Sequence, residues 1–206
     1  MKTIHITTLL VLASLTLFNS CSEDCVETVF YLDADGDGYG SKDHPIATCE
    51  RPANYVTNFS DPDDSDPDIS PENFWLGPKI TFTKADGADF TKAENQDRIT
   101  DNVWITRGNR RGIYNAAVED SFTQDSYYIS PEGTEWAMGT LSKWSELEFA
   151  PWVEAVYEEP PYAVGKDMVL HLKEENIYIQ VKFLSWSSGD RNGKGGFSYE
   201  RSTPSR

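Results

Sequence analysis

Three aspartates at alternate positions, Asp33, Asp35 and Asp37, form the strongest chemical signal in this chain. They lie in the run DADGDGYG, in which Gly36, Gly38 and Gly40 are interleaved. A loop bent around a cation can direct every second side chain inward, and glycine supplies the backbone angles that such a bend needs. A second acidic cluster follows and consists of Asp61, Asp63, Asp64, Asp66 and Asp68. Calcium binds through many oxygen ligands, so we predict a calcium site to which both clusters contribute.

The first cluster departs from the helix-loop-helix calcium hand. With Asp33 at the first position, the backbone carbonyl of Tyr39 falls at the seventh, but His44 occupies the twelfth, where a bidentate glutamate is required. The strand-like residues before the loop and Pro45 after it do not suggest flanking helices. The remaining metal ligands are therefore expected from the second cluster, namely Asp61, Asp63, Asp64 and Asp66. The alternative is a solvated acidic linker, because Asp, Pro, Ser and Gly are also typical of disordered segments.

The order DADGDGYG, TCERPANYV and DPDDSDPDISP resembles the secreted MopE-like metal-binding repeat, which is related in style to thrombospondin type 3 calcium repeats. In that family the second acidic cluster usually contains a cysteine that pairs with one upstream. This chain has Pro62 at that place, so Cys49 would pair with Cys25 instead. The available ligands are carboxylates and carbonyls, which favour calcium over the copper that the family name has at times implied.

Residues 1–20 have the pattern of a signal peptide, with a basic start and a short apolar run. Cys21 follows Ser20 and resembles the lipid-modified cysteine of bacterial lipoproteins, although Asn19 departs from the strict motif. The CSED that follows resembles a surface-export signal of such lipoproteins. We therefore expect lipidation at Cys21 and a lipid-anchored position at the outer membrane or cell surface. An ordinary secretory signal is the alternative. With Cys21 lipidated, an even pair of cysteines remains for a disulfide.

The formal charge of the chain is −16, and most of the imbalance lies in residues 21–73. Between Ser22 and Glu72 there are 14 acidic side chains against only Lys42 and Arg51. This asymmetry argues against nucleic acid as a partner. It also predicts that the acidic calcium-binding module, residues 21–73, folds poorly without cations, because uncompensated carboxylates repel one another.

Residues 74–206 have a different composition and contain all six tryptophans. Apolar residues alternate with polar ones in several short segments, and Met168–Leu172 and Ile177–Phe183 read as the two arms of a β-hairpin. The second arm would direct its isoleucines, Val181 and Phe183 towards a core. We predict a mainly β protein in which an antiparallel, jelly-roll-like β-sandwich follows the module. Segments such as ENQDRITDNVWITRG and IYIQVKF resemble a domain of secreted bacterial proteins to which no reaction is securely attached.

Aromatic residues suggest how the second domain could bind a ligand. Trp136, Trp144 and Trp152 lie among turn residues and could form an exposed platform for glycans, with Glu135 beside it, whereas Trp104 and Trp186 are expected in the core. For each of the three rings taken singly, packing in the core is the alternative. The preferred function is binding or structural, with a glycan or an extracellular protein as partner. A secreted carbohydrate-active enzyme is the alternative, in which Glu135 would be the first acid to test. For His171 a structural role is expected, and for Arg107 a place in a solvated basic loop.

Overall fold

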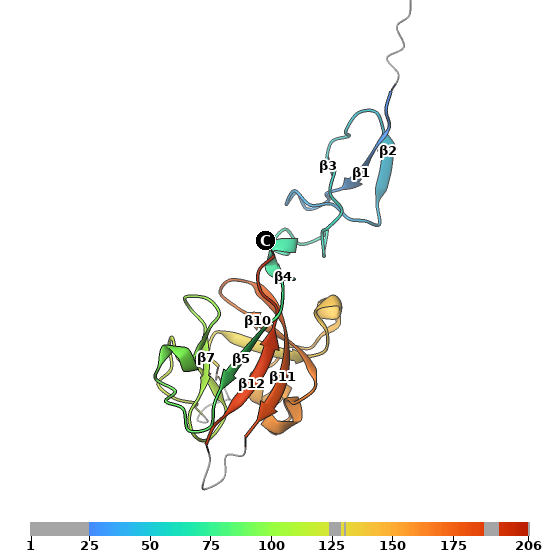
Figure 1. The fold of residues 1–206 in the computed structure, drawn as a ribbon. Helices are drawn as coiled ribbons and strands as arrows, with labels where there is room; N and C mark the ends of the chain where they lie inside the picture. Colours follow the sequence, from blue (N-terminus) through green and yellow to red (C-terminus); the bar gives the residue numbers. More distant parts are fainter. Residues whose placement is uncertain (1–24, 124–128, 130, 188–193, 206) are drawn as a thin grey trace, which may run out of the picture.

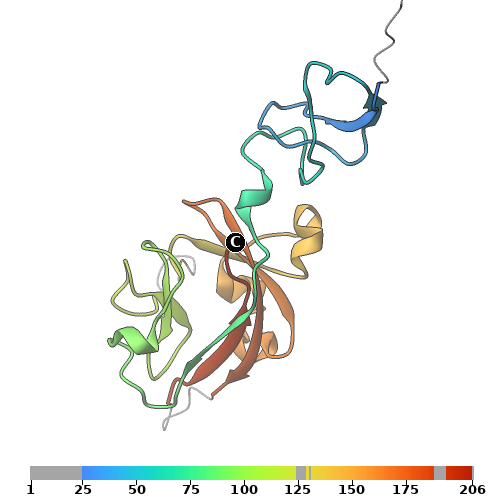
Figure 2. The same cartoon turned by 45° about the horizontal axis from the view of Figure 1, so that its top comes forward.

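The computed structural model describes residues 25–123, 129, 131–187 and 194–205. A small module, residues 25–73, lies at one end of the elongated molecule, and a larger β domain begins at residue 74 (Figures 1 and 2). The expected signal peptide and the expected lipidation site Cys21 lie outside the described residues. No helix among the described residues is long and apolar enough to cross a membrane.

The module is built on a small antiparallel sheet with strand order β2-β1-β3. Its strands are β1 (Thr28–Leu32), β2 (Pro45–Thr48) and β3 (Tyr55–Val56). Phe30 and Ile69 are the only buried large apolar side chains in its described part, and Ile69 packs against the β domain. A region with so little core needs covalent or metal cross-links to hold its fold.

The disulfide predicted between Cys25 and Cys49 is confirmed, with 5.6 Å between the two Cα atoms. Cys25 precedes β1 and Cys49 follows β2, so the disulfide closes the open end of this pair of strands. Inside the loop that it closes, Thr28 pairs with Thr48. On chain-entropy grounds, closing a loop of this size stabilises the fold by about 3 kcal/mol. The bridge therefore supplies part of the stability that the module cannot obtain from a core.

The β domain is organised around a six-stranded sheet with the order β5-β12-β11-β10-β9 and with β4 paired parallel to β11. All other pairs in this sheet are antiparallel. The strands are β4 (Phe74–Trp75), β5 (Ile80–Lys84), β9 (Thr134–Met138), β10 (Asp167–Leu172), β11 (Ile177–Trp186) and β12 (Phe197–Arg201). β9 to β12 follow one another as a meander. A jelly roll places non-consecutive strands side by side, and in this sheet only β5 with β12 and β4 with β11 do so.

The predicted hairpin is confirmed in β10 and β11, where Leu172 pairs with Ile177 across the turn. Ile179, Val181 and Phe183 alternate along β11 and are fully buried. Because successive side chains of a strand point to opposite faces, these three line the core face of the sheet. The alternation of apolar residues was therefore enough to identify both the strand and its inner face.

A second antiparallel sheet covers part of the inner face of the first and has the order β6-β7-β8. Its strands are β6 (Asp97–Arg98), β7 (Trp104–Arg107) and β8 (Ile113–Asn115). Short helical turns connect the strands and comprise η1 (Pro71–Asn73), η2 (Ala93–Asn95), η3 (Leu141–Glu146), α1 (Trp152–Ala155) and η4 (Pro160–Ala163). The mainly β class and the antiparallel sandwich predicted from the sequence are confirmed.

Two hydrophobic clusters pack on the large sheet. The first fills the inner face and contains Ile105, Ile113, Leu170 and Phe183. The second lies under η1 and η3 at the module end of the domain and consists of Ile69, Phe74, Leu141, Val169 and Tyr178. Since Ile69 comes from the module, the second cluster joins the two parts of the chain.

The prediction of an exposed platform is wrong for Trp136 and Trp152, whose side chains are both 0% exposed. Trp136 lies on the inner side of β9 and donates from Nε1 to the hydroxyl of Thr134 at 3.0 Å. Trp152 begins α1 and stacks on Trp186 with 5.2 Å between ring centroids. Both rings belong to the first cluster, because burying such large apolar surfaces stabilises a small domain more than exposing them.

Arginines account for two further differences from the sequence-based prediction. Arg107 is buried rather than solvated, and its guanidinium lies 3.8 Å from the ring centroid of Trp186. Trp104 is only partly buried, with Arg98 at 4.1 Å from its ring. Burial lowers the pKa of Arg107 to about 10, and carbonyl oxygens of Arg111, Ser187 and Gly196 accept its hydrogen bonds. The charge is therefore tolerated inside the sandwich.

Residues near the carboxyl end pass over the segment that leaves the module. The amide of Gly77 donates to the carbonyl of Thr203 at 2.8 Å, and the Thr203 hydroxyl donates to the carbonyl of Pro78 at 2.7 Å. A Cβ atom at residue 77 would come within 2.2 Å of the Pro204 carbonyl oxygen. Only glycine allows this close approach of the two backbones.

Candidate metal centre

The loop between β1 and β2 is held by the carboxylate of Asp33. Its oxygens accept hydrogen bonds from the amides of Gly36 at 2.8 Å and Gly38 at 3.2 Å. Both glycines have positive φ angles, 88° and 95°, which residues with a Cβ rarely adopt. The spacing of Asp and Gly in DADGDG therefore sets the curvature of the loop.

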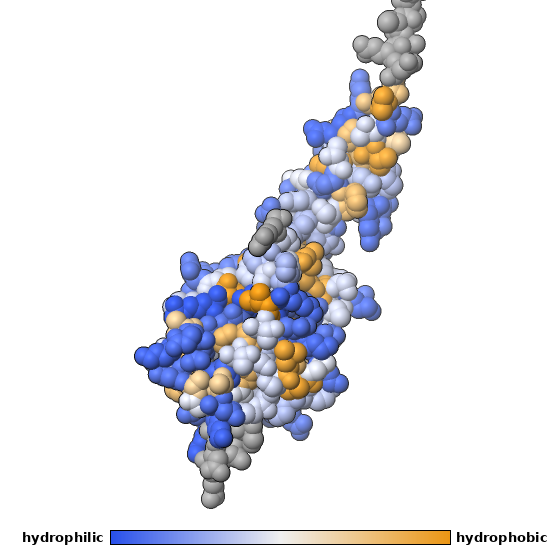
Figure 3. Space-filling model, in the orientation of Figure 1, coloured by the Kyte–Doolittle hydropathy of each residue, from blue (hydrophilic) through white to orange (hydrophobic). Residues whose placement is uncertain are grey.

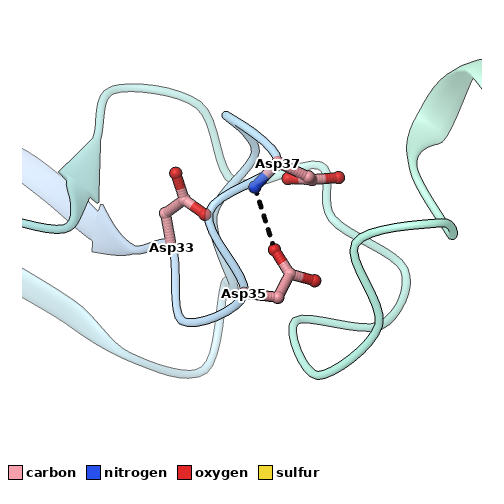
Figure 4. Close-up of side chains that lie close together, drawn as sticks. All are labelled: Asp33, Asp35 and Asp37. Carbon is pink, nitrogen blue, oxygen red and sulfur yellow. Dashed lines mark hydrogen bonds between the residues drawn. The ribbon is translucent and has the colours of Figure 1, made fainter.

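Asp35 and Asp37 each use one carboxylate oxygen to hold the next turn. Oδ1 of Asp35 accepts from the Asp37 amide at 3.1 Å, and Oδ1 of Asp37 accepts from the Tyr39 amide at 2.8 Å. Figure 4 shows the three aspartates of the loop around the same bend. The second oxygens of Asp35 and Asp37 are buried and have no hydrogen-bond partner in the described structure. Such oxygens are costly unless something compensates their charge.

The second acidic cluster is brought against the first. The amide of Asp61 donates to the carbonyl of Gly40, and Oδ1 of Asp64 accepts from the amide of Ala34 at 2.7 Å. Oδ1 of Asp61 accepts from the amide of Asp63 at 2.8 Å, while its Oδ2 is buried without a partner. The pattern found in Asp35 and Asp37 is thus repeated at Asp61.

These contacts produce two groups of three carboxylates. In each group every residue offers one oxygen, and the three oxygens lie within 4.8 Å of one another. Asp33, Asp35 and Asp37 form the first group; Asp35, Asp61 and Asp64 form the second. Asp35 belongs to both. These acidic clusters could bind a metal ion, because they present several oxygens from three separate turns to one small volume.

The other predicted ligands lie differently. Oδ1 of Asp63 accepts from the hydroxyl of Ser65, and Oδ1 of Asp66 accepts from the amide of Asp68 at 3.1 Å, so both side chains stabilise turns outside the two groups. The phenol of Tyr39 donates to Glu72 at 3.0 Å, and this hydrogen bond is the main cause of its raised pKa. The backbone carbonyl of Tyr39 as a metal ligand stays a prediction.

Burial and mutual repulsion shape the electrostatics of the cluster. Burial raises the pKa of Asp61 to about 6, the hydrogen bond from Asp63 opposes this, and the charges of Asp37, Asp35 and Asp64 add to it. The pKa of Asp37 is also raised, chiefly by burial and then by neighbouring carboxylates. A raised carboxyl pKa means that the ionised form is disfavoured until a positive charge offsets it.

A chain of hydrogen bonds links the acidic segment to the β domain. The Nδ2 of Asn176, in the β10–β11 turn, donates to the carbonyl of Asp68 at 2.9 Å, and the Asn176 carbonyl accepts from Asn73 at 2.7 Å. Oδ1 of Asn176 lies 3.0 Å from Nε2 of His171, whose Nδ1 lies 2.8 Å from Glu135. Both ring nitrogens therefore lie within hydrogen-bonding distance of side-chain oxygens. The structural role expected for His171 is consistent with these contacts.

Sequence reasoning missed the part that Asn176 plays in this junction. Its φ of 51° is in the left-handed region, which asparagine tolerates better than most residues. The turn at Lys173–Asn176 was itself predicted as the connection of the hairpin, and the pairing of Leu172 with Ile177 confirms it. Nothing in the sequence indicated that the turn touches a segment more than a hundred residues away.

The remaining predicted ligand-binding residues are separated. Trp144 lies in η3, is partly buried, and packs against Phe74 and Tyr178 with ring centroids 5.3 and 5.2 Å away. Glu135 lies in β9 and is held by His171. The predicted site around Glu135 and the three tryptophans is therefore not formed as a unit, and Trp144 lines a hollow in the surface to which the other three do not contribute.

No protein family model matches this chain, and neither a curated protein nor a solved structure shows significant similarity to it.

Proposed function

We propose that this chain is a lipid-anchored cell-surface protein whose acidic module binds calcium and thereby holds the β domain in a fixed orientation for binding an extracellular glycan or protein. The proposal combines the predicted lipid attachment at Cys21 with the carboxylate groups of the module. Calcium is the cation of choice because every candidate ligand is an oxygen and the groups contain no imidazole or thiolate.

One observation supports the metal site above all others. Asp35, Asp37 and Asp61 each use one oxygen for the backbone and keep a second oxygen buried without a hydrogen-bond partner in the described structure. An acidic linker without a metal would turn such oxygens to water, since desolvating a carboxylate is costly. The arrangement is explained if a cation lies between them.

The contacts at the junction give calcium a route to the β domain. Asp61 and Asp64 begin the same segment that reaches Asp68, whose carbonyl is bound by Asn176. Ordering that segment around a cation fixes the position of the Asp68 carbonyl. Calcium binding is therefore coupled to the orientation of the β domain, and the module serves as a stalk that stiffens when metal is present.

Calorimetric titration of the chain from residue 22 onwards with calcium and with magnesium tests the metal function. We expect calcium to bind more tightly, because a flexible ring of carboxylates fits a larger ion with variable coordination better than the strict octahedron of magnesium. A protein that binds neither cation would contradict the proposal.

The anchor is tested separately. Expression of the full chain with labelled palmitate should give a labelled protein, and Cys21→Ser should remove the label. Digestion of intact cells with protease then reports surface exposure. An unlabelled, freely secreted wild-type protein would contradict the anchor without affecting the calcium site.

A further inference from the structure

A groove of about 640 Å³ lies where the module meets the β domain. Its module side includes Phe59 and Asp64, and its β-domain side includes Leu76, Ser142 and Trp144. A volume of this size is within the usual range for sites that hold small ligands. The space-filling view of Figure 3 shows that the surface near the junction mixes hydrophobic and hydrophilic residues instead of forming one large apolar patch.

The apolar side chains of the groove are held on a rigid support. Phe59 is 58% exposed and packs against Tyr31 with 5.1 Å between centroids. Trp144 is anchored against the aromatic rings of Phe74 and Tyr178. Leu76 is 70% exposed on the opposite wall from Phe59. An exposed ring such as Phe59 and a partly exposed ring such as Trp144, both with fixed positions, are suited to the C–H faces of a sugar ring, which stack on them at low entropic cost.

The polar side chains of the groove are mostly small hydroxyls and carboxylates. Ser41, Ser60, Ser142 and Ser145 line it together with Lys42, Asp43 and the metal-group residues Asp61 and Asp64. Hydroxyls both donate and accept, and carboxylates accept, so they match the alternating donors and acceptors of vicinal sugar hydroxyls. The three carboxylates outnumber the one ammonium group, of Lys42, and therefore oppose an anionic ligand by charge repulsion. The many polar groups oppose a purely apolar ligand, because they would be buried without partners.

We propose that this groove binds a neutral oligosaccharide, and that binding requires the metal centre. We expect binding to require the metal because Asp61 and Asp64 belong both to the wall of the groove and to a carboxylate group of the module. This inference rests on the proposed calcium function, since calcium sets the position of the module wall. The inference locates the glycan site at the junction and away from Trp136 and Trp152, which are buried.

The test uses the chain from residue 22 onwards in calcium and, in parallel, in EGTA. The probes are the hexasaccharides of cellulose, starch, xylan, mannan and laminarin, with an oligogalacturonate as the anionic comparison. Binding is followed by calorimetry and by tryptophan fluorescence, because Trp144 lines the groove. We expect at least one neutral probe to bind in calcium and to bind at least tenfold more weakly in EGTA.

Two variants and one control locate the site. Leu76→Ser and Trp144→Ala should each weaken binding at least tenfold, and the first is exposed enough to leave the fold intact. Leu184→Ser makes the same chemical change at a residue that is 45% exposed and outside the groove, so binding should stay within twofold of wild type. Circular dichroism checks that each variant is folded.

Each outcome decides one of the two proposals. If calcium binds but no neutral probe does, the groove proposal is wrong and the calcium function stands. Preference for the oligogalacturonate would also overturn it, as would equal losses in Leu76→Ser and Leu184→Ser. If a probe binds equally well in calcium and in EGTA, the coupling to the metal centre is wrong. Absence of calcium binding in the titration overturns the proposed function itself.

Discussion

Replacing Asp35 by asparagine should change the stability of the module in opposite directions with and without metal. The carboxylate of Asp35 belongs to both acidic groups. Asparagine keeps an oxygen that can accept the hydrogen bond from the Asp37 amide, so the local turn is retained while one negative charge is lost. We therefore expect Asp35→Asn to stabilise the metal-free module and to weaken calcium binding.

The magnitudes follow from the geometry. Asp35 is grouped with four other carboxylates whose oxygens lie within 4.8 Å of it. Two unit charges at this separation repel by about 0.9 kcal/mol in bulk water, and physiological salt reduces this to about half, so the four pairs sum to about 2 kcal/mol. The attraction of calcium for one carboxylate at about 2.4 Å is about 3.5 kcal/mol in bulk water and about 2.5 kcal/mol after the same screening by salt. The relief of repulsion is present with and without metal and cancels in the affinity, so the loss of about 2.5 kcal/mol corresponds to calcium binding that is about 70-fold weaker.

Hydrogen exchange of peptides from residues 25–73 measures the first effect, and calorimetry measures the second. In EGTA the variant should exchange about 30-fold more slowly than wild type, which corresponds to about 2 kcal/mol. Asp68→Asn is the matched control, because it removes the same charge from the same module outside both groups. Faster exchange of Asp35→Asn in EGTA, or unchanged calcium affinity, would refute the reasoning.

Three further predictions concern the protonation of Asp61, the disulfide of the module, and the contact between Asn176 and the module. Burial raises the pKa of Asp61 from 3.8 to about 6, so folding of the metal-free module takes up a proton between these two pH values. The free energy of unfolding of the metal-free module should therefore fall by about 1–2 kcal/mol, after allowance for solvent screening, as pH rises through that window. Calcium needs the ionised carboxylate, so the rise in Tm caused by calcium should shrink between about pH 7.5 and about pH 5; an equal rise at both values would contradict a ligand role for Asp61. Replacing Cys25 and Cys49 together by alanine should destabilise the module by about 3 kcal/mol, measured by hydrogen exchange in calcium, and unchanged exchange would show that the metal alone holds the fold. Asn176→Gly keeps the left-handed turn but loses the bond to the module, so small-angle scattering of the calcium-loaded protein should show a wider range of orientations, and an unchanged scattering curve would contradict coupling through this side chain.

Local patterns in the sequence were sufficient for several features of this molecule. The alternation in Ile177–Phe183 identified a strand and its buried face, because the side-chain period of a strand is two. Cysteine parity and the missing family cysteine identified the disulfide between Cys25 and Cys49. Aspartate spacing also indicated which acidic clusters should meet, since a bent loop that binds metal repeats its ligands at short intervals.

The features that sequence reasoning missed depend on contacts between distant segments. Trp136 and Trp152 stand among turn residues, but the sheet and α1 place both rings in one core. Arg107 has a basic neighbourhood in the sequence, yet carbonyls from a loop about 80 residues later accept its hydrogen bonds. Asp63 and Asp66 resemble the other acids of their cluster, and only the folded turns separate those that face the centre from those that do not. Residue type does not encode such long-range partners.

The close crossing of Gly77 with Thr203 and Pro204 has a practical consequence for experiments. In both ribbon views the carboxyl end of the chain lies beside the short helix η1 and not at the far tip of the β domain (Figures 1 and 2). Anything fused after residue 205 would therefore emerge next to the acidic module. A polyhistidine tag there would place a second metal chelator near the carboxylates and distort every titration with divalent cations. Because the amino-terminal side of the described chain also leads directly into the module, an affinity tag at either end has to be removed before such titrations.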